Sequence, residues 1–120
     1  YFPQVEALGE IHEAHPNSTF LLNTRNLDDW IQSVRTWSNM DHRLAKCNIT
    51  GLPPRARSLS DDDLRGFYET QIRRVRRFVV EHPSHKLVEV AIDAPNAGEV
   101  LENAFGIDKS CWGQHNTNSV

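Results

Sequence analysis

The 120-residue chain lacks a long apolar run, a glycine-rich loop ahead of a helix, and a cysteine framework. Its longest apolar stretches, such as residues 20–22 and 78–80, have three residues, whereas a helix that spans a bilayer needs about 20. We therefore expect no membrane span in this chain. The two cysteines, Cys47 and Cys111, are too few for a disulfide scaffold.

An excess of positive charge is also missing. The chain has 13 Lys and Arg residues against 16 Asp and Glu residues, for a net charge of −3. Proteins that coat nucleic acid are usually basic overall, so we expect no nucleic-acid partner. One local phosphate site remains compatible with this charge. The length and the hydrophobic content of 38% fit one domain with its own core.

Apolar spacing and capping residues predict four helices. Side-chain oxygens of Asn and Ser suit helix starts because they accept from free backbone N–H groups, and glycine suits a helix end. The expected helices run over residues 4–15, from an Asn26 cap to about Met40, from a Ser60 cap to His82, and from Asn96 or Ala97 to Gly106. Residues 43–59 are expected to form a long loop.

Two short strands alternate with these helices. Residues 19–24 predict a buried strand, because Phe20, Leu21 and Leu22 follow one another without polar alternation; residues 87–93 predict a second strand. Strands separated by helices favour a parallel sheet in an α/β fold. Two strands are too few for a stable open sheet, and the chain begins at Tyr1 rather than Met. We therefore expect the C-terminal part of a larger, here incomplete, domain.

The segment with the clearest chemistry runs from the first strand into the second helix. Arg25 follows the strand, and Ser33 lies eight residues later on the helix. Ligands bind at the carboxyl ends of strands in parallel α/β sheets, and the planar guanidinium suits a phosphate. The alternative is that Arg25 pairs with Asp28 or Asp29 and that Ser33 is a surface serine.

This segment resembles the 3′-phosphate-binding segment of sulfotransferases that use 3′-phosphoadenosine 5′-phosphosulfate (PAPS). In that family a strand ends in Arg and a Ser follows eight positions later on the next helix. The resemblance to sulfotransferase-like proteins of algae and microbes covers nearly the whole chain. It includes residues 1–8, 16–25, 29–30 and 33–34, then Tyr68, Val75, Phe78, residues 86–88 and 105–106, and a closing Cys-Trp-Gly-Gln-His-Asn-Thr-Asn at 111–118.

The resemblance implies a three-layer, P-loop-type fold like that of nucleoside triphosphate hydrolases, with residues 1–120 as its C-terminal part. It implies transfer of a sulfuryl group from PAPS to a hydroxyl or amine, without a metal. The acceptor would be a carbohydrate, a small alcohol or a protein tyrosine. No Gly-Lys-Ser or Gly-Thr-Ser loop for the phosphosulfate is present, so we assign no catalytic residue and expect this chain alone to be inactive.

Further cofactor-binding residues follow from the same resemblance. In the family a loop covers the nucleotide, and Arg55 and Arg57 lie in the corresponding loop. Trp112 is the one large apolar residue of the tail, and we expect it to pack back onto the domain and to hold His115 and Asn116 near the cleft. With Arg25 and Ser33, these residues form the expected site for PAPS or its product 3′-phosphoadenosine 5′-phosphate (PAP).

Two other functions remain open from the sequence. The chain fits a degenerate module that binds a nucleotide or protein without catalysis, and it also fits a nucleotide kinase, which has the same architecture. Cytoplasm and Golgi lumen both remain open as compartments.

Two smaller patterns also allow two interpretations each. His12 and His15 have the spacing of zinc ligands on a helix, but no Cys or carboxylate completes such a site, so we interpret them as unrelated helical histidines. Arg73, Arg74, Arg76 and Arg77 fit a solvated helix face, or else a contact with an acidic partner or a sulfated glycan.

Overall fold

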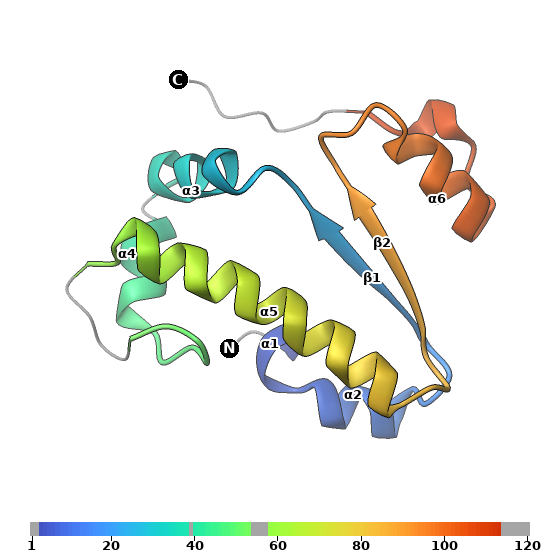
Figure 1. Ribbon diagram of the computed structural model, residues 1–120, viewed down its shortest axis with the longest axis horizontal. Helices are drawn as coiled ribbons and strands as arrows, with labels where there is room; N and C mark the ends of the chain where they lie inside the picture. The colour runs from blue at the N-terminus through green and yellow to red at the C-terminus, as the bar shows by residue number, and fades with distance from the viewer. Residues whose placement is uncertain (1–2, 39, 54–57, 114–120) are drawn as a thin grey trace.

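A computed structural model describes residues 3–38, 40–53 and 58–113 (Figure 1). The chain is a mixed α/β fold with a small parallel sheet, as the alternation of strands and helices predicts. The elements in chain order are α1 (Pro3–Glu6), α2 (Leu8–Ala14), β1 (Thr19–Thr24), α3 (Leu27–Thr36), α4 (Met40–Lys46), α5 (Asp61–Glu81), β2 (Lys86–Ala91), α6 (Ala97–Phe105) and the 3-10 turn η1 (Lys109–Cys111).

The two strands pair in parallel along their whole length. Thr19 lies opposite Lys86 and Thr24 opposite Ala91. The long helix α5 makes the crossover between the strands, and Figure 1 shows it on one side of the sheet with α6 on the other. The ring of Phe20 on β1 stacks 5.9 Å from that of Phe78 on α5, so this face of the sheet packs on the helix.

Local capping chemistry sets three of the helix ends. The Asn26 side chain accepts from the backbone N–H of Asp29 at the start of α3. Ser60 and Asp63 form a reciprocal capping box at the start of α5. Gly106 ends α6 with a φ of 70°, a left-handed conformation that glycine adopts without steric cost. These three predictions from the sequence are confirmed.

The hydrophobic core lies among the helices rather than on the sheet. Leu64 is fully buried at the start of α5 and packs with residues from α1, α3, α4 and the segment before α5. The buried members of this core are Val5, Ile31, Val34, Leu44, Ala45, Ile49, Leu52, Leu59 and Leu64.

Three predictions about the elements are wrong in detail. The expected helix over residues 4–15 is broken at Ala7, whose φ and ψ of −126° and 32° are not helical. The second helix ends at Thr36, and the segment expected as a loop from residue 43 begins inside α4. The strand β1 is not buried: its residues alternate between exposed and half-buried, and Leu21 is 50% exposed. Successive side chains of a strand point to opposite faces. Phe20 faces α5, whereas Thr19, Leu21 and Asn23 lie on the opposite face and stay exposed.

Candidate functional site

A large apolar cavity runs along β1. Its volume is about 830 Å³, and it lies between β1, the helices α2 and α3, and the middle of α5. Most of its walls are aliphatic and aromatic, including Leu8, Phe20, Trp30 and Val75. Arg25 and Ser33 both line it. The two residues that the sequence singled out therefore meet at one cavity.

Arg25 brings a cationic group to a wall that has little polar character. The Nε atom of Arg25 is buried and has no hydrogen-bond partner. The expected alternative, an ion pair with Asp28 or Asp29, is not among the ion pairs of the described residues, because Asp28 pairs instead with Arg65 at 3.1 Å. A buried donor without a partner is costly, so an anion that accepts from this guanidinium would relieve that cost.

The backbone at Arg25 is held by residues far away in sequence. The hydroxyl of Tyr68 on α5 accepts from the Arg25 N–H at 2.9 Å and donates to the Arg25 carbonyl at 3.0 Å. The next residue, Asn26, donates its N–H to Oδ2 of Asp93, just after β2, at 2.8 Å. The turn that carries Arg25 is thus fixed to α5 and to the end of β2. The sequence indicated Tyr68 only as one of the residues that carry the family resemblance and gave no role to Asp93.

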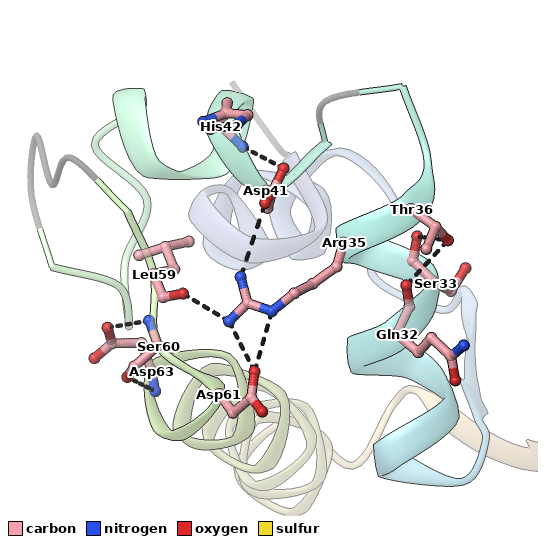
Figure 2. Close-up of polar contacts among 10 residues, drawn as sticks. All are labelled: Gln32, Ser33, Arg35, Thr36, Asp41, His42, Leu59, Ser60, Asp61 and Asp63. Carbon is pink, nitrogen blue, oxygen red and sulfur yellow. Dashed lines mark hydrogen bonds and ion pairs between the residues drawn. The ribbon is translucent and has the colours of Figure 1, made fainter.

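Ser33 and Arg35 point to different sides of α3 (Figure 2). Arg35 points toward the start of α5, where its guanidinium donates to Asp61 at 2.7 and 3.1 Å and to the Leu59 carbonyl at 2.7 Å. Its Nη1 also lies 3.8 Å from Asp41 of α4. These contacts tie α3 to α4 and α5. They hold the helix that carries Ser33 at the cavity.

Of the other residues expected at the cofactor, the structure describes Trp112, which does not line this cavity. Trp112 packs on α6, where a Cβ added at Gly98 would lie 3.1 Å from the Trp112 Cβ, and it is 41% exposed and does not line the cavity. Arg55, Arg57, His115 and Asn116 lie outside the described residues.

Three histidines meet near the start of β1, whereas Arg25 follows its end, and none of the three lines the cavity. His12 of α2 places Nδ1 2.7 Å from Nε2 of the buried His85, which lies just before β2. The ring of His82, which caps α5, lies 4.4 Å from that of His12. Partial burial, and then the neighbouring His82 and His85, lower the pKa of His12 below its usual 6.5, while Glu13 opposes this shift.

The histidines that lie together are not the pair His12 and His15 to which the sequence drew attention. His12 contacts His85, which is 73 residues away, and not His15. Within the described chain, no group of three or more His, Cys, Asp or Glu side chains has an arrangement that could hold a metal ion.

The arginines of α5 pair with their surroundings instead of forming one basic patch. Arg76 donates to Glu89 of β2, Arg77 to Glu81, and Arg74 to the Val5 carbonyl of α1 at 2.8 Å. The two cysteines are exposed and free.

Comparison with known proteins adds no relative: no family model, curated protein or solved structure matches the chain. In the part of the chain that the structure describes, no helix has both the length and the apolar character to cross a membrane.

Proposed function

We propose that the chain is the nucleotide-binding part of a PAPS-dependent sulfotransferase, and that Arg25 and Ser33 bind the 3′-phosphate of PAPS. The observation that carries this proposal is the buried, unpartnered Nε of Arg25 at a cavity that Ser33 also lines. In this proposal the sheet is part of a larger P-loop-type domain, and β1 ends where nucleotides bind in such sheets.

The proposed roles of the two residues differ in strength. The guanidinium of Arg25 would make a charge-assisted hydrogen bond to the phosphate, contributing about 1.5–3 kcal/mol. The hydroxyl of Ser33 would also donate a hydrogen bond to the phosphate. Because the hydroxyl is uncharged, we expect this bond to contribute less than that of Arg25. Neither residue would contact the sulfuryl group, so both act by positioning the nucleotide for in-line transfer.

The hydrogen bonds that hold the backbone at Arg25 and Asn26, here called the brace, support this role. Tyr68 and Asp93 fix the backbone on both sides of the turn, at distances of 2.8 to 3.0 Å. A cation held in place before the ligand arrives loses less entropy on binding than a mobile one. A surface arginine that only keeps a protein soluble needs neither a fixed backbone nor a cavity beside it.

Calorimetric titration of PAP and AMP into the intact protein, at one salt concentration, tests the proposal. The two nucleotides differ by the 3′-phosphate, so wild type should prefer PAP. The substitution Arg25→Ala should weaken PAP binding by about 10- to 150-fold, and Ser33→Ala by about 2- to 10-fold. The matched control is Arg77→Ala, because the Arg77 side chain is 82% exposed and pairs with Glu81 on the same helix.

Two results would overturn the proposal. One is equal affinity of wild type for PAP and AMP. The other is a PAP preference that survives in Arg25→Ala or is lost equally in Arg77→Ala. Sulfuryl transfer by the protein, measured with PAPS and a panel of carbohydrate, alcohol and tyrosine acceptors, then separates a transferase from a module that only binds the nucleotide.

A further inference from the structure

The helix α2 is the most weakly attached wall of the cavity. None of its residues is buried, although Leu8 and Ile11 line the cavity. Among the described residues, the contact of His12 with His85 is the one side-chain hydrogen bond between α2 and another element. By contrast, the neighbouring α1 is held by Arg74 at the Val5 carbonyl and by Thr50 at Glu6.

The protons in the His12–His85 contact follow from the partners of His85. Nδ1 of His85 lies 2.9 Å from the Ser18 carbonyl, which can only accept, and 3.3 Å from the Ser18 hydroxyl, which can donate or accept. The shorter contact favours a proton on this nitrogen. When His85 is neutral, its Nε2 accepts from Nδ1–H of His12 across 2.7 Å. When His85 is protonated, Nε2–H donates to a neutral His12. When both rings are protonated, two N–H groups face each other and no hydrogen bond forms.

The groups around the His12–His85 contact disfavour a positive charge on His12 more than they favour it. His82 and His85 both disfavour a proton on His12, and Glu13 of α2 favours one. The charged residues next in sequence are Glu81 at the end of α5, Lys86 at the start of β2 and, beyond α2, His15. Of these, Glu81 pairs with Arg77. The phenyl rings of Phe20 and Phe78 lie 4.6 and 6.2 Å from the ring of His85.

We propose that the His12–His85 contact is a pH-dependent clasp, which holds α2 against the α5–β2 turn near neutral pH and releases it when both rings are protonated. The closed clasp accommodates at most one charged ring of the two, and the open form accommodates two. Opening is therefore coupled to the uptake of at least one proton. Because Leu8 and Ile11 move with α2, release opens one wall of the cavity.

Amide hydrogen exchange of the full chain at pH 6.5 and pH 5.0 tests the clasp, with rates normalised to the intrinsic exchange rate at each pH. One coupled proton changes an equilibrium up to tenfold per pH unit. Protection of residues 8–14 should therefore fall by about 10- to 30-fold relative to residues 64–75 of α5. The clasp is wrong if both segments lose protection in parallel.

Two matched variants separate the clasp from a general effect of acid. In His12→Gln the amide can donate to a neutral His85 or accept from a protonated one, so the fall in protection should shrink to less than about 3-fold. His15→Gln removes a histidine just after the same helix and should respond like wild type. A wild-type response in His12→Gln would contradict the clasp.

A titration of the histidine rings by NMR tests the clasp in the wild-type protein, without any substitution. In wild type, the rings of His12 and His85 should not both be protonated while the amides of α2 remain protected. Double protonation with α2 still protected would overturn the clasp even if His12→Gln did not fold. None of these measurements contains a nucleotide, so their outcome does not depend on the proposed function.

Discussion

Replacing Arg25 by methionine should stabilise the empty protein. The substitution keeps an unbranched apolar stem at the cavity wall and removes the buried Nε that has no partner. An unsatisfied buried donor costs about 1–3 kcal/mol, and part of the gain is offset by the contacts of the lost guanidinium. We expect the free energy of unfolding to rise by about 1–2 kcal/mol relative to wild type.

Urea unfolding measures this change. For a small domain the free energy falls by about 2 kcal/mol per molar urea, so the midpoint should rise by about 0.5–1 M at an unchanged slope. The control is Arg77→Met on the exposed face of α5, where the change should stay within about 0.5 kcal/mol. A lower midpoint for Arg25→Met would show that the guanidinium stabilises the fold, and the argument from its missing partner would fail.

Nucleotide should stabilise wild type more than Arg25→Met. PAP at 100 times its dissociation constant adds about 2.7 kcal/mol to a protein that binds it only when folded. Wild type should gain this stability, whereas Arg25→Met should gain much less. A stable variant that no longer responds to PAP would mean that Arg25 is kept for binding, at the expense of stability.

Three further predictions concern the scaffold. Ser60→Ala removes the capping box of α5 and should lower the free energy of unfolding by about 1 kcal/mol in urea; no change would mean that the helix start is fixed by packing alone. Leu64→Ala leaves a void at a fully buried position and should lower it by about 2–5 kcal/mol, while a loss under 1 kcal/mol would place Leu64 outside the core. Because the pKa of His12 is lowered from 6.5 in the folded protein, the unfolded chain binds more protons just below that pH. Stability should therefore be constant above about pH 6.5 and fall as the pH drops below it, and less so in His12→Gln; a stability that rises on acidification to pH 5.5 would contradict the sign of the shift.

Sequence patterns predict the parts of the fold that depend on neighbouring residues. The caps at Asn26 and Ser60 and the helix end at Gly106 each rest on interactions within a few residues. The parallel pairing also follows from the order of strands and helices. The break at Ala7 had no signal of this kind, because neither glycine nor proline stands there.

Features that depend on distant residues were missed or misjudged. An apolar run such as Phe20-Leu21-Leu22 is buried only where other elements cover both faces of the sheet. Here Leu21 is half exposed. Tyr68 reaches Arg25 across 43 residues and His85 reaches His12 across 73. For the candidate site, the sequence pointed to Arg25 and Ser33 but could not place their cavity, the brace of Arg25, or the histidine contact.

The two ends of the cavity differ in how they are held. At one end, the turn that carries Arg25 is fixed by hydrogen bonds from α5 and from the segment after β2, and none of these partners is a histidine. At the other end, α2 depends on a contact between two imidazoles. Protonation of both imidazoles would therefore act on α2, which forms one wall of the cavity, and not on the hydrogen bonds that hold Arg25. It would change access to the cavity while the proposed anion-binding residue keeps its position.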